Sequence, residues 1–290
     1  PGGGVWMLWS DSAHPPVFTA LGEEEPGFPA GEVPPLAGRS RQVWVQGPGG
    51  PVHALLSVPA VGEGPYPTVF VLHGGPDDHD RDAFDPQVAA WTDEGFAVVR
   101  VNYRGSTGYG RAWTAALRER VGHTELEDVD AVRRWVIEQK VADPGRLVVS
   151  GSSWGGYLAL LAVGTRPQDW ALALAGAPVA DCAAAHEGVM EDIKALDRAL
   201  FGGSPAQVPE RYRDASPSTY ADRVRVPVFI SAGVNDARCP IGQARAYAQR
   251  LRERGVVVEF HEHGAGHSMT GVEERVEVFR RQVAFTRAHL

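Results

Sequence analysis

Residues 151–156 read Gly-Ser-Ser-Trp-Gly-Gly, and this short stretch decides the fold. It follows an apolar run at 147–150 that predicts a strand, and it precedes an apolar stretch that predicts a helix. Gly-x-Ser-x-Gly in that setting indicates a sharp turn that exposes a nucleophilic serine, Ser153. Such a turn leaves no room for side chains two places before and after the serine, and Gly151 and Gly155 have none. A glycine-rich turn with incidental serines is the alternative; the flanking strand and helix favour the nucleophile.

Apolar, β-branched runs recur on both sides of this turn and predict eight strands, with helical patterns between many of them. Alternating strands and helices predict an α/β fold: a mostly parallel sheet of about eight strands with helices on both faces. Glycines between the first two runs predict an antiparallel hairpin at one edge. The strand runs are 42–46, 52–58, 68–72, 97–102, 146–150, 171–175, 226–231 and 256–261, and the helical patterns are 125–139, 157–164, 241–254 and 272–289.

The composition excludes several classes of protein. Of the 290 residues, 43% are hydrophobic and 22% are charged, which is ordinary for a folded domain and unlike a disordered chain. No apolar run approaches the roughly 20 residues that cross a bilayer, so no membrane association is expected. With 28 basic and 36 acidic residues the net charge is −8, which argues against a nucleic acid partner. Two cysteines exclude a disulfide framework and favour free thiols in a reducing compartment.

The first 38 residues differ from the rest of the chain. They are rich in Pro and Gly, and only 5–9 and 16–21 have strand patterns, too little to fold alone. We therefore divide the chain into an N-terminal segment, 1–38, and a catalytic domain, 39–290. Pro1 opens the sequence without a charged and then apolar leader, so the expected location is the cytoplasm, provided that no native N-terminal segment is absent.

An acid and a histidine follow the serine in the chain order of the α/β-hydrolase fold. Asp236 comes after the run at 226–231, and His267 comes after the run at 256–261. Loops at the carboxyl ends of parallel strands meet at one edge of the sheet. His267 is therefore predicted to accept the proton of Ser153, and Asp236 to orient the imidazole.

Three other arrangements use nearby residues. Asp181 also follows an apolar run, but its strand should neighbour that of the nucleophile and place Asp181 against the pocket. His261, His263 and His267 are of the residue types that hold zinc, yet no cysteine or carboxylate cluster supports them. The acidic run at 77–82 lacks the spacing of a calcium loop and is expected to be a solvated loop. No metal and no cofactor are expected.

His-Gly-Gly-Pro at 73–76 follows the predicted strand at 68–72. The two glycines let the backbone approach a bound acyl group, and the N–H of Gly75 is predicted to donate to its oxyanion. The second donor is the N–H of Trp154, the residue after the nucleophile. A simple turn is the alternative for this loop, and the turn around Ser153 favours the functional interpretation.

Six motifs in order give the chain a family resemblance. It resembles the catalytic domain of the prolyl oligopeptidase family of serine peptidases, nearest to the acylaminoacyl-peptidase-like branch, over about residues 39–290. The motifs are His-Gly-Gly-Pro at 73–76, Asn-Tyr-Arg-Gly-Ser-Thr-Gly-Tyr-Gly at 102–110, Asp-Pro-Gly-Arg at 143–146, Gly-Ser-Ser-Trp-Gly-Gly-Tyr at 151–157, Asn-Asp-Ala-Arg-Cys-Pro at 235–240 and Ala-Gly-His at 265–267.

The resemblance implies hydrolysis of short peptides behind a β-propeller that filters substrates by size. No propeller is present here, but residues 5–21 resemble its closing strands, so we expect a piece of a longer polypeptide. The resemblance also implies that Arg238 binds a substrate carbonyl, with a salt bridge to a loop carboxylate as the alternative. Cys239 is expected to line the specificity pocket together with Trp154.

Three functions remain open at this stage. Peptide hydrolysis leads, an esterase or acyl transferase would use the same triad, and a catalytically inactive binding module would use none of it. The sequence leaves open whether cleavage is internal or from an end, and whether the protein is a homo-oligomer.

Overall fold

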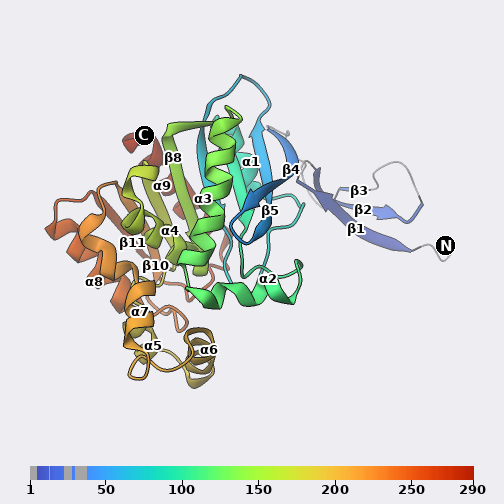
Figure 1. Ribbon diagram of the computed structural model, residues 1–290. Coiled ribbons are helices and arrows are strands. Elements are labelled where there is room, and N and C mark those ends of the chain that lie inside the picture. Colours follow the sequence, from blue (N-terminus) through green and yellow to red (C-terminus); the bar gives the residue numbers. More distant parts are fainter. Residues whose placement is uncertain (1–4, 13, 23–27, 30–37) are drawn as a thin grey trace.

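The computed structural model describes residues 5–12, 14–22, 28–29 and 38–290 (Figure 1). Eight strands form one sheet in the order β11–β10–β9–β8–β6–β7–β5–β4. β5 runs antiparallel to β4 and β7, and all other neighbours are parallel. The predicted α/β-hydrolase fold, with its hairpin at one edge, is confirmed. The strands are β1 (Trp6–Asp11), β2 (His14–Ala20), β3 (Phe28–Pro29), β4 (Gly38–Gly47), β5 (Gly50–Pro59), β6 (Tyr66–Leu72), β7 (Ala97–Asn102), β8 (Ala142–Ser152), β9 (Leu172–Gly176), β10 (Val228–Gly233) and β11 (Val258–His263).

Helices cover both faces of the sheet. Along β6, Phe70 and Leu72 belong to the core shared with α3, α4 and α8, whereas Val69 belongs to the core shared with α1 and α9. This alternation is what a strand buried on both faces requires. The helices are α1 (Pro86–Asp93), α2 (Arg111–Ala116), α3 (His123–Glu138), α4 (Trp154–Thr165), α5 (Cys182–Gly188), α6 (Glu191–Phe201), α7 (Pro209–Ala215), α8 (Ile241–Glu253) and α9 (Val272–His289), with short 3-10 turns at Leu117–Glu119, Pro167–Asp169 and Pro217–Arg223.

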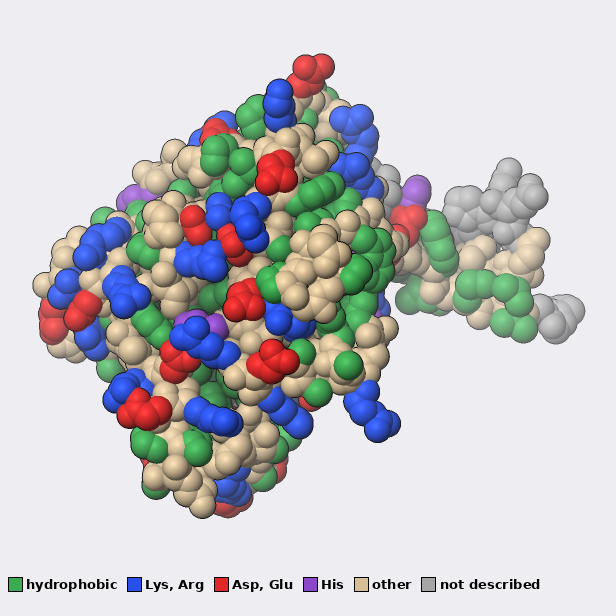
Figure 2. Space-filling view, in the orientation of Figure 1, with side chains coloured by type: hydrophobic (Ala, Val, Ile, Leu, Met, Phe, Trp, Pro, Cys, Tyr) green, Lys and Arg blue, Asp and Glu red, His purple; other side chains and the backbone are tan. Residues whose placement is uncertain are grey.

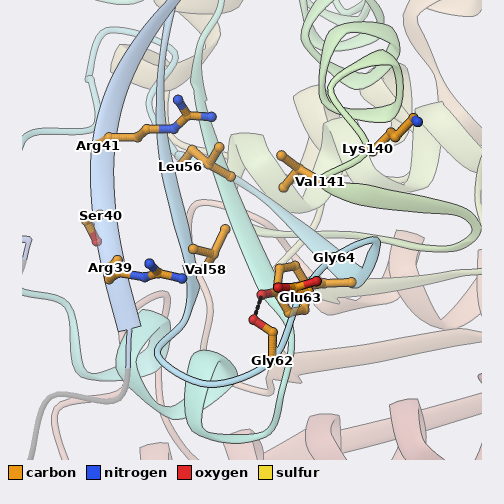
Figure 3. Close-up of a pocket in the computed structure, with 11 residues that line it drawn as sticks. Arg39, Ser40, Arg41, Leu56, Val58, Gly62, Glu63, Gly64, Lys140 and Val141 are labelled. Atoms are coloured by element: carbon orange, nitrogen blue, oxygen red, sulfur yellow. Dashed lines mark hydrogen bonds between the residues drawn. The ribbon is translucent and has the colours of Figure 1, made fainter.

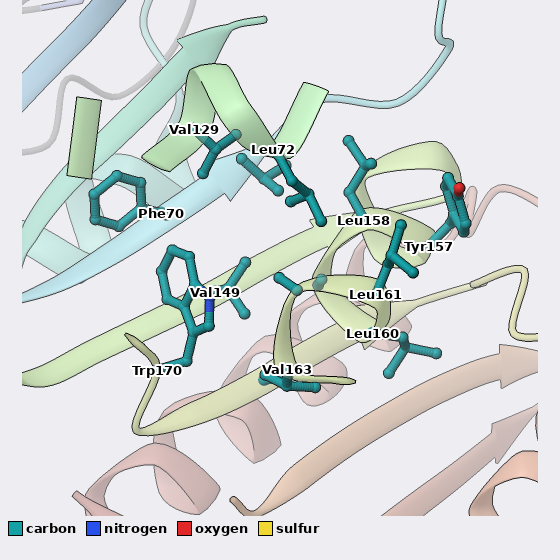
Figure 4. Close-up of a cluster of buried hydrophobic side chains, with 14 of the residues drawn as sticks. Phe70, Leu72, Val129, Val149, Tyr157, Leu158, Leu160, Leu161, Val163 and Trp170 are labelled. Carbon is teal, nitrogen blue, oxygen red and sulfur yellow. The ribbon is translucent and has the colours of Figure 1, made fainter. Parts of the chain in front are cut away.

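α4 is buried nearly all round, from Gly155 to Gly164. Figure 4 shows its leucines in one buried cluster with Leu72 of β6 and Val129 of α3. Phe70 and Trp170 meet edge to face in the same cluster, with 5.3 Å between ring centroids. A helix that is apolar on every side must be buried on every side. This burial holds the start of α4 rigidly against the sheet.

α5, α6 and α7 form a helical insertion between β9 and β10 that the sequence did not indicate (Figure 1). Phe201 at the end of α6 stacks on Tyr212 of α7, with ring centroids 4.1 Å apart. His186 of α5 hydrogen bonds Asp197 of α6 over 2.9 Å. No helix in the described part of the chain is long and apolar enough to span a membrane.

The N-terminal strands pair as a small antiparallel sheet that projects from the main body (Figure 1). Its β1–β2 turn contacts the loop before α1: the N–H of Ser12 donates to Asp82 over 2.8 Å, and the N–H of Phe84 donates to Ser10 over 3.1 Å. The two predicted strand patterns are thus strands, and the turn between them contacts the loop before α1.

The expectation that 77–82 is a solvated loop holds for Asp77, Asp78, Arg81 and Asp82, which are exposed, but Asp80 is more enclosed. The backbone N–H of Asp80 donates to Asn102 over 2.7 Å, and its carboxylate lies 3.8 Å from Arg100. Burial raises the pKa of Asp80 to about 7, although the Arg100 charge lowers it. The acidic run is part of the surface that the β1–β2 turn contacts.

Candidate active site

Ser153 occupies the turn between β8 and α4 with backbone angles of φ 56° and ψ −118°. This region is unfavourable for any residue with a Cβ, so the surroundings must hold it in place. A Cβ on Gly155 would collide with the carbonyl oxygen of Leu72, and a Cβ on Gly151 would collide with Gly155. The two glycines are therefore required by the close approach of the backbone on both sides of the serine.

The structure brings the three predicted side chains together. His267 Nε2 lies 2.9 Å from Ser153 Oγ, and His267 Nδ1 lies 2.9 Å from Asp236 Oδ2. A carboxylate only accepts, so Nδ1 carries the hydrogen and Nε2 keeps a lone pair toward the serine hydroxyl. The side chain of Asp236 is 1% exposed and that of His267 is 17% exposed, so the acid is shielded while the imidazole reaches solvent.

Asp236 is held in its charged form. Burial raises the pKa of its carboxyl, but hydrogen bonds from His267 and from the backbone N–H groups of Cys239 and Arg238 outweigh burial and lower it below the ordinary value. Both N–H groups donate to Oδ1 over 2.8 Å. The acid is thus fixed in orientation and ionised beside the imidazole.

Two backbone N–H groups near Ser153 have no acceptor. The loop after β6 passes the nucleophile so closely that a Cβ on Gly74 would lie 3.7 Å from the Cβ of Ser153. Within the described residues, neither the N–H of Gly75 nor that of Trp154 donates to another protein group. Backbone N–H groups that are free to donate, beside a serine and at the start of a helix, can stabilise an oxyanion.

Side chains that the sequence did not single out hold this loop. His73 stacks on Tyr103 with ring centroids 4.2 Å apart, and its Nε2 lies 2.8 Å from Ser106 Oγ. The Tyr103 hydroxyl donates to the His73 carbonyl over 2.8 Å. Tyr103 and Ser106 lie in the motif at 102–110, which was the signal in the sequence, although the motif does not reveal that these side chains contact His73.

Arg238 and Cys239 follow the acid on the same loop. Arg238 is exposed and forms no ion pair with any residue that the structure describes, so the predicted alternative of a salt bridge is wrong. Cys239 is 7% exposed, so its side chain is buried. Burial, followed by the Asp236 charge, raises the pKa of this thiol to about 12. The thiol is therefore protonated at neutral pH.

The other predicted arrangements do not form. Asp181 caps α5, where its carboxylate accepts from the N–H of Ala184 and the hydroxyl of Ser218, each over 2.9 Å. The rings of His261 and His263 lie 6.2 Å apart, and they form no metal-ligating group with His267 in the described ranges. Asp236 is thus the acid that meets the imidazole.

A cavity of about 420 Å³ lies at the other edge of the sheet (Figure 3). Its lining includes Tyr66 at the start of β6 and Val141 just before β8, which are the amino ends of parallel strands. Arg39 and Arg41 line it from β4, as Figure 3 shows. Ser153 instead follows the carboxyl end of β8. This cavity is therefore separate from the serine site.

The sheet order, the turn at Ser153 and the loops that carry Asp236 and His267 define an α/β-hydrolase. The particular family follows from comparison with known proteins. The sequence profile of the prolyl oligopeptidase family matches residues 82–290, and the chain belongs to that family.

Individual relatives agree with this assignment. The chain is 30% identical over 230 residues to the acylamino-acid-releasing enzyme of Rattus norvegicus, covering 77% of this chain and 31% of that protein. It is 31% identical over 201 residues to the acylamino-acid-releasing enzyme of Arabidopsis thaliana, covering 67% and 26%. A puromycin-hydrolyzing peptidase of Mycobacterium tuberculosis superposes with a TM-score of 0.88 and 28% identity, over 100% of this chain and 46% of that one. The chain thus spans between a quarter and a third of the length of the two acylamino-acid-releasing enzymes.

Proposed function

We propose that this chain is the catalytic domain of a serine peptidase that hydrolyses short peptides through an acyl-enzyme on Ser153. The observation that carries the proposal is the hydrogen-bonded line from Ser153 through His267 to Asp236, with 2.9 Å at each step. Membership in the prolyl oligopeptidase family supports the same chemistry.

In the proposed reaction, Ser153 Oγ attacks the scissile carbonyl while His267 Nε2 accepts the hydroxyl proton. Asp236 stabilises the imidazolium that forms. The N–H groups of Gly75 and Trp154 donate to the carbonyl oxygen as it becomes negative. His267 then gives its proton to the leaving amine. A water molecule repeats these steps on the acyl ester and releases Ser153.

Arg238 is assigned to substrate binding. Its side chain is exposed beside the acid loop and has no ion pair among the described residues, so the guanidinium is available to a substrate carbonyl. A charge-assisted hydrogen bond of this kind would fix the peptide next to the scissile residue. Cys239 and the indole of Trp154 are assigned to the walls of the specificity pocket.

A further domain is proposed on the N-terminal side. The named relatives are two to four times as long as the stretch they share with this chain. β1 and β2 expose Trp6, Leu8 and Phe18, with exposed fractions of 56%, 58% and 49%. Figure 2 shows these strands standing apart from the main body. We assign this apolar surface to contact with a β-propeller, and the intact mass of the native protein tests it: a mass near 31.2 kDa contradicts the propeller.

Labelling with a fluorophosphonate probe tests for an active serine. Ser153→Ala should abolish labelling, whereas Ser152→Ala, which removes the neighbouring hydroxyl, should keep it. A chain that takes no label is a binding module and not an enzyme. Turnover of peptide anilides is then compared with turnover of p-nitrophenyl esters; ester turnover alone would assign an esterase or acyl transferase.

A panel of substrates tests which of the activities named for the relatives this protein has. The panel contains N-acylated amino acid anilides, unblocked amino acid anilides, puromycin and longer peptides. Preference for acylated or free N-termini identifies cleavage from an end, and cleavage inside long peptides identifies an endopeptidase.

A further inference from the structure

Cys239 brings a third kind of metal-binding atom to the Ser153 site. One ligand atom each of Asp236, Cys239 and His267 lies within 4.8 Å of the other two. Asp236 and Cys239 are buried and His267 is partly exposed, so the group is enclosed on one side and open toward the solvent on the other. Neither the sequence motifs nor the proposed peptide hydrolysis requires a thiol at this place.

The three groups form the donor set of a zinc site. Carboxylate oxygen, thiolate sulfur and imidazole nitrogen bind Zn²⁺ at about 2.0–2.3 Å, which puts tetrahedral ligand atoms roughly 3.3–3.8 Å apart. The three ligand atoms of this protein lie within 4.8 Å of one another, which is close to that spacing.

We propose that Asp236, Cys239 and His267 bind a thiophilic divalent ion such as Zn²⁺, and that this ion inhibits the enzyme reversibly. Binding forms a metal–sulfur bond, and the proton of the Cys239 thiol leaves to solvent; no electron is transferred. The ion takes the charge of Asp236 and the lone pair of His267 Nδ1, the ring nitrogen beside that carboxylate, and the hydrogen that Nδ1 carried moves to Nε2. Nε2 can then no longer accept the Ser153 proton, so catalysis stops until a chelator removes the ion.

Cys182 provides a matched control. Both thiols of the chain are buried, Cys182 at 8% exposure and Cys239 at 7%, and burial raises both pKa values to about 12. In the described ranges only Cys239 has a carboxylate and an imidazole within reach for a metal ion. A thiol effect that is not specific to the site would therefore appear equally in variants of Cys182.

Direct binding is tested with Co²⁺ in place of Zn²⁺, because thiolate ligation of Co²⁺ gives a charge-transfer band in the near ultraviolet. The band is expected in the otherwise unchanged chain, in Ser153→Ala and in Cys182→Ser. It should be lost in Cys239→Ser. Absence of the band in the unchanged chain, or its survival in Cys239→Ser, overturns the proposal. This measurement needs no catalysis, so it stands apart from the proposed peptidase function.

Inhibition is tested by titrating Zn²⁺ against hydrolysis of a peptide anilide, with each variant normalised to its own metal-free rate; this arm rests on the proposed function. Zn²⁺ should inhibit, EDTA should restore the rate, and Mg²⁺, which prefers oxygen ligands, should have no effect. Cys239→Val should raise the inhibition constant roughly tenfold or more, since losing even an outer partner of a metal ligand costs 10–100-fold. Cys182→Ser should keep the original constant. Equal inhibition of Cys239→Val contradicts the site, and where that variant does not fold, Cys239→Ser gives the same comparison.

Discussion

The indole of Trp154 donates a hydrogen bond over 3.2 Å to Glu125, a carboxyl group on α3 with no exposed surface. The other oxygen of Glu125 accepts the N–H of Gly122 over 2.8 Å. Trp154 follows the nucleophile and supplies one of the free N–H groups beside it. Glu125 thereby connects the start of α3 to the start of α4, and it supports the proposed oxyanion site from behind.

Glu125 should make the stability of the protein depend on pH. Burial raises its pKa from 4.5 to about 8, against the opposing hydrogen bonds of its own N–H, Gly122 and Trp154. The folded state therefore keeps a proton that the unfolded chain releases at lower pH. The contribution is complete below pH 4.5 and is lost as the pH rises to about 8, by at most about 1.4 kcal/mol per pH unit.

Glu125→Gln removes this titration. Urea unfolding of both proteins at several pH values should show the stability advantage of the unchanged chain shrinking as the pH rises toward 8. A difference between the two proteins that stays constant with pH would show that Glu125 does not titrate in this range.

Gly155 should tolerate no side chain. The Cβ of Gly155→Ala would meet the carbonyl oxygen of Leu72, which is backbone and cannot move aside, so we expect a loss of about 3 kcal/mol and of activity. Gly242, exposed on α8 with nothing within 4 Å of an added Cβ, is the control. Gly242→Ala should stabilise by roughly 0.5–1 kcal/mol. Thermal unfolding measures both, and a Gly155→Ala variant as stable as Gly242→Ala would refute the close approach.

The sheet and four of its helices could be predicted because their residues face a core. In α3, Val129, Val132 and Val136 are spaced three and four residues apart, and all three are buried. α5 and α7 have only seven residues each. Helices this short form through packing on their neighbours, which local sequence does not reveal. The insertion they build was therefore missed.

The site could be anticipated from order along the chain, because each predicted side chain follows a strand of a parallel sheet. The residues that hold these side chains and loops in place could not be anticipated in this way. Glu125 sits in a helix rich in charged residues, where a glutamate normally faces solvent, and nothing local marks it as buried. Tyr103 acts through its hydroxyl on a loop 30 residues away in the sequence. Such contacts are fixed only when distant segments pack.

Asp236→Asn should leave the fold intact and lower kcat about 10⁴-fold, because an amide favours the wrong tautomer of His267. Steady-state rates of the variant and of the unchanged chain on the same peptide anilide measure the loss. An unchanged kcat in Asp236→Asn would contradict the role of Asp236 in orienting His267.

Arg238→Ala should raise KM for peptides roughly tenfold or more, with a smaller change in kcat, because a charge-assisted hydrogen bond to bound substrate is lost. Arg39→Ala removes an equally exposed charge from the cavity at the other edge of the sheet, and its kinetics should match those of the unchanged chain. If both variants raise KM alike, the effect is one of overall charge, and Arg238 does not contact the substrate.

Ser153→Gly separates the strain of the turn from its chemistry. The φ of 56° and ψ of −118° at Ser153 cost on the order of 1–3 kcal/mol in a residue with a Cβ. Glycine avoids this cost, but it also gives the unfolded chain more conformational freedom. The free energy of unfolding of Ser153→Gly should therefore be about 1 kcal/mol higher than that of Ser153→Ala, which keeps the Cβ. Both variants should be inactive. Urea unfolding of the pair measures the difference, and if Ser153→Ala is equally stable or more so, the backbone at the nucleophile stores no strain.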